Sequence, residues 1–241
     1  MKIRSHKNKS QVIVYDADSV QEPGPALFEP GYWERQGRVS GHATGRGRVL
    51  LLDTDFGPAV LRQYLRGGWP AHLSRERYVF TGFIRSRPMA EFRMLAALTG
   101  AGLPVPEPLA ALCDRRGVFY RGWLLTRRIM HVVPLADRLA DCLADAALWR
   151  RIGRVIRRFH DAGVVHADLN ARNILLGPDD AIHLVDFDRA RKSAENARAF
   201  AGNLMRLRRS LQKLWPAAER DRLDVCWRDL LSGYSTAAEL A

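Results

Sequence analysis

The chain has 241 residues, 47% of them hydrophobic, which is enough for a packed core in one domain or in two small lobes. Its 38 Lys and Arg against 26 Asp and Glu give a formal net charge of +12, which favours anionic partners such as nucleic acid, lipid headgroups or an acidic substrate. The scattered Cys113, Cys142 and Cys226 argue against a disulfide framework or a zinc site, and with no signal-peptide pattern or membrane-spanning apolar run they predict a cytoplasmic protein.

The predicted structure of the first part of the chain changes near residue 38. Glycine and proline recur in residues 1–37, so this segment is predicted to be a lead-in without defined structure. Residues 38–64 predict β structure, with strands over residues 48–53 and 59–64 joined by a turn at residues 54–58.

The later elements are mainly helical. Apolar spacing predicts a helix over residues 89–98, and a strand is predicted over residues 119–126. Beyond residue 134 an apolar stripe marks a second helix, which Gly163 would end. The stripe consists of Leu148, Ile152, Val155, Ile156 and Phe159. The order predicts an α+β fold of the bilobal protein-kinase type, with a nucleotide-binding N-lobe at residues 38–126 and a helical C-lobe at residues 127–241.

The most informative motif runs from His166 to Leu176 and is followed by Val185-Asp186-Phe187-Asp188. It sets two acids and an amide in the order and spacing of the kinase H-x-D-x-x-x-x-N loop and its D-F-G element. In such a centre one carboxylate, here Asp168, orients the attacking hydroxyl as the catalytic residue. An amide and a second carboxylate, here Asn173 and Asp186, hold Mg²⁺ against the nucleotide phosphates.

A hairpin would bring the metal-binding residues together. The turn residues Gly177-Pro178-Asp179-Asp180 lie between two apolar runs, so the chain is predicted to reverse there and return Asp186 toward Asn173. The alternative is an ordinary hairpin with unrelated polar residues. The joint register of Asp168, Asn173 and Asp186 favours the catalytic centre.

A kinase also needs a backbone lid over the phosphates. Gly41, Gly45 and Gly47 are the candidates, because glycine allows close backbone approach. The segment departs from G-x-G-x-x-G, since Leu50 stands at the third glycine position, and an ordinary turn is the alternative.

The cation for the phosphates is predicted at Arg62, in Ala59-Val60-Leu61-Arg62, where the kinase motif V-A-I-K has lysine. Arginine keeps the charge and can bind phosphate through two N–H groups. Glu91, on the following helix, is its expected ion-pair partner in a nucleotide-binding role. The alternatives are a surface strand arginine and a helix acid paired with Arg87.

Three features argue for an acceptor smaller than a protein. Ala167 replaces the arginine of kinases regulated by activation-loop phosphorylation, and Asp188 replaces the glycine of D-F-G. The 53 residues after Asp188 contain no A-P-E element, which protein kinases use to bind peptide substrates.

A basic amphipathic helix is predicted over residues 204–214. Leu204, Leu207, Leu211 and Leu214 share one face, and Arg206, Arg209 and Lys213 lie off it. Such a helix either rests on an anionic membrane surface or packs its apolar stripe against the lobe.

These residues together resemble a known family. The chain is similar to the 3-deoxy-D-manno-octulosonic acid (Kdo) kinases of the lipopolysaccharide core kinase group, over roughly residues 38–190. In that family Arg62 and Asp188 are ordinary at their positions. The matching segments are residues 60–68, 91–95, 102–106, 124–126, 166–176 and 185–189.

The resemblance implies ATP- and Mg²⁺-dependent phosphorylation of the 4-hydroxyl of a Kdo residue on a lipid A precursor, with Asp168 as the active-site residue. It also implies a peripheral location on the cytoplasmic face of a bacterial inner membrane, with a Kdo-lipid IVA-type glycolipid and the anionic membrane surface as partners. No nucleic acid is expected. The alternatives are a heptose or other small-molecule kinase, a bacterial protein-tyrosine kinase, and a basic membrane- or nucleic-acid-binding pseudokinase.

Overall fold

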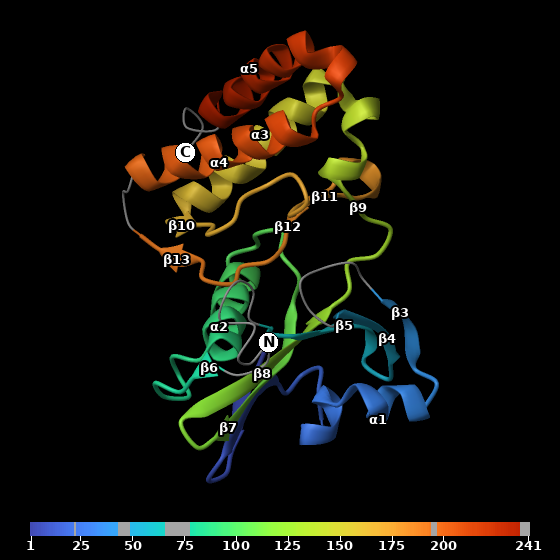
Figure 1. Ribbon diagram of the computed structural model, residues 1–241, viewed down its shortest axis with the longest axis vertical. Helices are drawn as coiled ribbons and strands as arrows, with labels where there is room; N and C mark the ends of the chain where they lie inside the picture. Colours follow the sequence, from blue (N-terminus) through green and yellow to red (C-terminus); the bar gives the residue numbers. More distant parts are fainter. Residues whose placement is uncertain (22, 43–48, 66–77, 194–196, 237–241) are drawn as a thin grey trace. The chain divides into compact units, whose positions relative to one another are not determined.

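The computed structural model describes residues 1–21, 23–42, 49–65, 78–193 and 197–236. The chain divides into two compact units (Figure 1). The first unit comprises Met1–Gly100 and Pro106–Arg128, and the second comprises Ala101–Val105 and Ile129–Ala241. The first is rich in antiparallel sheet and the second is mainly helical, which confirms the predicted α+β class.

The first unit is built on one antiparallel sheet with the strand order β1-β2-β7-β8-β5-β4-β3, and β6 pairs with β8. Its strands are β1 (Ile3–Lys7), β2 (Gln11–Asp16), β3 (Val39–His42), β4 (Val49–Thr54), β5 (Gly57–Gln63), β6 (Tyr78–Val79), β7 (Pro108–Arg116) and β8 (Phe119–Arg127). Its helices are the short η1 (Pro25–Phe28) and α1 (Pro30–Arg35), and the longer α2 (Arg87–Gly100).

The expectation that residues 1–37 lack defined structure is wrong. β2 pairs with β7, so this segment extends the central sheet, and β1 adds a further strand to it. Leu27, Phe28 and Trp33, from η1 and α1, are buried in the same core cluster as sheet residues. The segment is therefore part of the first unit.

Helices pack against both faces of the sheet in the first unit. On one face Leu61 packs in the core cluster with η1 and α1. Because successive residues of a strand point to opposite faces, Arg62 points away from that cluster. On this second face it meets Glu91 of α2, which Figure 1 shows lying along β7 and β8.

The predicted strands at residues 48–53 and 59–64 correspond to β4 and β5, which pair with the predicted turn between them. Gly57 has a φ of +96°, the left-handed region that glycine enters without strain. The predicted helix and third strand correspond to α2 and β8.

The second unit carries three long helices, α3 (Ala146–Asp161), α4 (Ala197–Leu214) and α5 (Arg220–Thr236), shown in Figure 1. One small sheet has the order β12-β11-β9 and another pairs β10 with β13. These strands are β9 (Val133–Pro134), β10 (Val164–Val165), β11 (Ile174–Leu176), β12 (Ile182–Leu184) and β13 (Arg191–Lys192). Short helical turns are η3 (Leu135–Asp137), η4 (Leu139–Cys142), η5 (Pro178–Asp180) and η6 (Ala217–Glu219).

The apolar stripe of α4 packs inside this unit. Leu207 and Leu211 are completely buried, whereas Arg206, Arg209 and Lys213 are exposed. This burial agrees with the second alternative, in which the apolar stripe of the helix packs against the lobe. Among the described helices, none has both the length and the hydropathy needed to cross a bilayer.

Candidate functional site

The hairpin of β11 and β12 places Asn173 and Asp186 at the same end. Ile174 pairs with Leu184, and the backbone N–H of Val185 donates to the Asn173 carbonyl at 3.0 Å. Asp186 follows at once, with an exposed carboxylate and a φ of +65°. Such a backbone is uncommon for residues other than glycine and costs about 1 kcal/mol or more, which is a feature of functional sites.

The loop before the hairpin ties Asp168 to Asn173. The side-chain amide nitrogen of Asn173 donates to the Asp168 carbonyl at 2.9 Å, and that of Asn170 donates to the same oxygen at 3.0 Å. The Asp168 side chain itself is 62% exposed. The loop therefore fixes the backbone of Asp168 and leaves its carboxylate open to a ligand.

His166 connects this loop to the strand that leads into Asp186. Its Nδ1 accepts from the Asp168 backbone N–H at 3.1 Å, and its Nε2 lies 3.0 Å from the Val185 carbonyl. Because Nδ1 accepts, the proton sits on Nε2 and is donated to Val185. The ring is buried and packs edge-on against Phe187, with ring centroids 4.8 Å apart. The backbones of Asp168, Asn173 and Val185, the residue before Asp186, are thus held by one set of hydrogen bonds.

Asn203 of α4 anchors the loop, although it is not among the residues predicted for the site. Its Oδ1 accepts from the His166 N–H at 2.9 Å, and its Nδ2 donates to the His166 carbonyl at 2.7 Å. Asn203 is buried and lies on the same face of α4 as Leu207 and Leu211. The feature of the sequence that could have identified Asn203 is a polar residue at one position of an apolar stripe.

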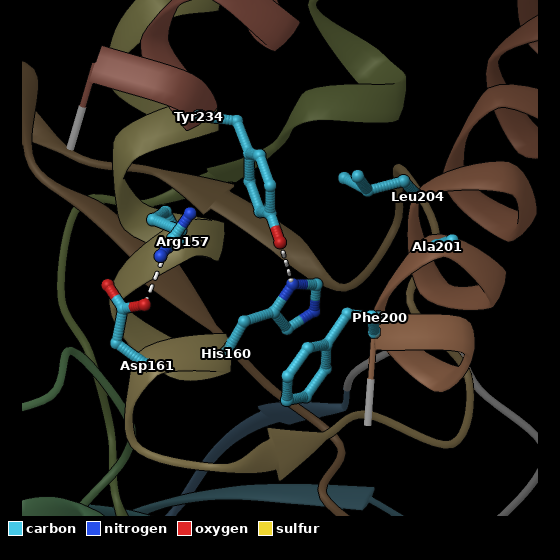
Figure 2. A pocket seen from close by; sticks show the side chains of 8 residues that line it. Arg157, His160, Asp161, Phe200, Ala201, Leu204 and Tyr234 are labelled. Atoms are coloured by element: carbon cyan, nitrogen blue, oxygen red, sulfur yellow. Dashed lines mark hydrogen bonds and ion pairs between the residues drawn. The ribbon is translucent and has the colours of Figure 1, made fainter. Parts of the chain in front are cut away.

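His160 of α3, shown in Figure 2, contacts Asn203 and so extends this network of polar contacts. Its Nε2 lies 3.4 Å from Asn203 Oδ1, its Nδ1 lies 2.8 Å from the Tyr234 hydroxyl, and its ring stacks on Phe200 at 4.4 Å. Burial lowers the pKa of His160 to about 4, and the hydrogen bond from its Nε2 to Asn203 Oδ1 only partly opposes this. The imidazole is therefore neutral at physiological pH.

An open pocket of about 420 Å³ lies beside His160, between Arg157 and Asp161 on one side and Leu204 on the other (Figure 2). Asp168, Asn173 and Asp186 do not line it. The pocket is thus separate from the predicted catalytic residues.

In the first unit, the expected ion pair between Arg62 and Glu91 is formed, with Arg62 Nη2 2.5 Å from Glu91 Oε2. Glu91 is buried and also accepts a hydrogen bond from the Tyr64 hydroxyl. Burial and the neighbouring Glu91 carboxylate raise the pKa of Tyr64 well above its ordinary value, so Tyr64 remains a donor. The guanidinium of Arg62 also stacks over the Tyr64 ring at 4.8 Å. Arg62 is thereby held in place with 25% of its side chain still exposed.

The candidate lid is described only in part. Gly41 lies in β3 and pairs with Leu51, in a backbone conformation that other residues adopt equally well. Gly45 and Gly47 lie outside the described residues.

The chemistry of Asn173 and Asp186 fits a magnesium ion. Mg²⁺ prefers oxygen ligands and usually keeps water and phosphate oxygens in its coordination shell. The Asn173 amide nitrogen is committed to Asp168, which leaves the amide oxygen as the coordinating atom. The described residues contain no cluster of three or more His, Cys, Asp or Glu suited to a metal.

Comparison with known proteins places the chain in a family. The model of the lipopolysaccharide kinase (Kdo/WaaP) family matches residues 31–234. A 3-deoxy-D-manno-octulosonic acid kinase of Xanthomonas euvesicatoria is 42% identical over 225 residues, which cover 93% of this chain and 90% of that protein. One from Stenotrophomonas maltophilia is 44% identical over 213 residues, covering 88% and 84%. With the match spanning both units, the chain belongs to the lipopolysaccharide kinase (Kdo/WaaP) family.

Proposed function

We propose that this chain transfers the γ-phosphoryl group of ATP to the 4-hydroxyl of a Kdo residue on a lipid A precursor, in lipopolysaccharide core biosynthesis. The family and the names of the relatives support this reaction. The observation that carries it is the bond from the Asn173 amide to the Asp168 carbonyl at 2.9 Å. This bond joins the proposed acceptor-binding and metal-binding residues in one loop.

In this proposal Asp168 is the catalytic residue. Its exposed carboxylate accepts a hydrogen bond from the 4-hydroxyl and orients that oxygen toward the γ-phosphorus. As the new O–P bond forms, the bond from the γ-phosphorus to the β–γ bridging oxygen breaks. The hydroxyl proton passes to Asp168, and ADP leaves. Family membership and the open position of the Asp168 side chain support this role.

The remaining site residues are proposed to bind the nucleotide. Asn173 and Asp186 are the proposed Mg²⁺ ligands, and the bound ion would neutralise charge on the phosphates. Arg62, positioned by its ion pair with Glu91, is proposed to contact the phosphates. Gly41, together with Gly45 and Gly47, is proposed to cover them.

The reaction is tested by incubating the purified protein with ATP, Mg²⁺ and a Kdo-lipid IVA acceptor. Mass spectrometry should find the acceptor heavier by one phosphoryl group, and NMR should place that group on O4. Parallel incubations with a heptose acceptor and with a peptide library test the alternative kinases. Phosphorylation of either of these in place of the Kdo-lipid would overturn the proposal.

Asp168→Asn tests the catalytic assignment. Because the side chain is exposed and the loop is held through its backbone, the variant should fold normally and lose about 100- to 10,000-fold in kcat. Asp179→Asn is the matched control, since Asp179 is an exposed acid in the turn of the same hairpin with a φ of +53°, which asparagine tolerates. Asp179→Asn should keep full activity. Full activity in Asp168→Asn would show that another residue orients the acceptor.

A further inference from the structure

One cation lies beside the proposed catalytic carboxylate. Arg206 of α4 places Nη1 3.9 Å from Asp168 Oδ1, and the two side chains are 47% and 62% exposed. From the sequence, Arg206 is expected only on the basic side of an amphipathic helix. Its place next to Asp168 comes from the packing of α4 against the loop.

Three hydrogen bonds, made by two residues, hold this face of α4 against the loop. Asn203 bonds both backbone groups of His166, and the Ser210 hydroxyl accepts from the Ala171 N–H at 3.2 Å. Positions 203, 206 and 210 follow the i, i+3, i+7 spacing of one helix face. Arg206 therefore lies between two anchors, and its backbone is fixed relative to the loop that carries Asp168.

The contact between Arg206 and Asp168 is looser than the other ion pairs of this unit. Arg157 approaches Asp161 to 2.6 Å and Arg208 approaches Asp224 to 2.9 Å, both within hydrogen-bond distance. At 3.9 Å Arg206 is near enough for attraction but too far for a hydrogen bond. A guanidinium has five N–H donors in a planar fork that matches a carboxylate. Arg206 thus has donors to offer a second anion while staying beside Asp168.

The proposed acceptor supplies such an anion. Kdo is a sugar acid whose carboxylate is attached to C2, two ring carbons from C4. If Asp168 binds the 4-hydroxyl, a cation a few ångströms away lies next to the same sugar ring. We propose that Arg206 binds the carboxylate of the sugar-acid acceptor and selects it over neutral sugars. This inference rests on the proposed function and adds a residue that recognises the acceptor.

The test changes the carboxylate and the arginine together. A synthetic glycolipid with one Kdo residue is prepared as the free acid and as the methyl ester, so that any lipid phosphates are the same in both. With the wild-type chain, kcat/KM should fall about 10- to 100-fold from the acid to the ester. Arg206→Ala should lose about as much on the acid, mainly through KM, and should leave the rate on the ester within about 3-fold of the wild type. On the acid, the kcat/KM of Arg206→Lys should lie between those of the wild type and Arg206→Ala, because lysine keeps the charge without the planar fork.

Two controls accompany the variants. Arg209→Ala removes the same charge from another exposed position of α4 and should match the wild type on both acceptors. The KM for ATP and the melting temperature should be unchanged in Arg206→Ala, which excludes a nucleotide-binding or folding effect.

The outcomes are separable. Equal losses on acid and ester in Arg206→Ala would mean that Arg206 acts through Asp168 or the phosphates, and would refute the inference while leaving the proposed function intact. No loss on either acceptor would refute it as well. No transfer by the wild-type chain to either acceptor, with ATP bound normally, would refute the proposed function and this inference with it.

Discussion

At the scale of single residues, the loop of the candidate site is held by buried polar groups that satisfy one another. Asn203 occupies a position where leucine would fit the apolar stripe of α4, yet it bonds both backbone groups of His166. A buried polar group without a partner costs about 1–3 kcal/mol, so this arrangement is stable only while every member is present.

Asn203→Ala should therefore cost about 2 kcal/mol or more in the free energy of unfolding, because it removes two buried hydrogen bonds to the backbone of His166. It should also lower kcat, since the same loop carries Asp168. Urea unfolding and steady-state kinetics measure the two effects. Gln212→Ala, which removes an exposed amide from the same helix, is the control and should change neither. A wild-type kcat in Asn203→Ala would mean that the loop is held without this anchor.

His160 makes the stability of this region depend on pH. The pKa of His160 is lowered by burial from its ordinary value of 6.5 to about 4. The folded protein therefore binds fewer protons than the unfolded chain between these values. The contribution of His160 to the free energy of unfolding is fully present above pH 6.5. It is lost as the pH falls toward 4, by about 3 kcal/mol in total.

Urea unfolding of the wild type and of His160→Phe, at several pH values from 7.5 to about 4.5, tests this linkage. Phenylalanine can keep the stacking on Phe200 but cannot take up a proton. The stability of the wild type should fall more steeply with acid than that of the variant. Equal slopes would show that folding leaves the pKa of His160 unchanged.

At the scale of elements, the second unit depends on the close approach of α3 and α5. A Cβ added at Gly153 would lie 2.0 Å from the Leu230 carbonyl oxygen, and one added at Gly233 would lie 2.0 Å from that of Arg150. Both distances are far below any van der Waals contact. The two glycines allow the backbones to meet, and a larger residue would force the helices apart.

Gly153→Ala should therefore destabilise the protein by about 1–3 kcal/mol or more, despite the higher helix propensity of alanine. Gly202→Ala in α4 is the matched control, because a Cβ there meets nothing within 4 Å. The control should be stabilised by about 0.5–1 kcal/mol. Melting temperatures of both variants test the pair of opposite signs, and stabilisation by Gly153→Ala would contradict the close packing.

At the scale of the whole molecule, the formal charge of +12 is the dominant property. The apolar residues Leu207 and Leu211 of α4 are buried, so they are not available to insert into a bilayer. Any attachment to the inner membrane through this helix is therefore expected to be electrostatic and to weaken with salt.

The chain should sediment with vesicles containing about 30% anionic phospholipid at low salt, and should be released at about 0.5 M salt, where screening is strong. Vesicles of phosphatidylcholine alone should not bind it. Retention at high salt would indicate apolar insertion and would contradict an electrostatic surface.

Much of the site was predictable because its signals are local. The apolar runs and the turn at residues 177–180 correctly predicted the hairpin of β11 and β12. The kinase pattern of a strand cation and an acid on the following helix predicted the ion pair of Arg62 and Glu91. The pair is formed because strand alternation places Arg62 on the face that α2 covers. The roles assigned to Asp168, Asn173 and Asp186 stay predictions.

β1 and β7 are among the elements that were not predicted from the sequence, because their stability is not local. β1 is exposed along its whole length and has no apolar alternation, so only its pairing with β2 makes it a strand. β7 begins with seven consecutive buried residues, a continuous run that has no period of two. Partners distant in the sequence decided both.

The sequence by itself determined the reaction class and the identity of the candidate catalytic residues, because side-chain chemistry and spacing within a loop and its hairpin are local properties. Tertiary structure alone decided that β1 and β2 join the sheet, that Asn203 anchors the loop, and that Arg206 lies 3.9 Å from Asp168. Asn203 and Arg206 lie more than thirty positions from the loop residues they contact. Contacts of that range depend on how a helix packs, and no local pattern of residues encodes this.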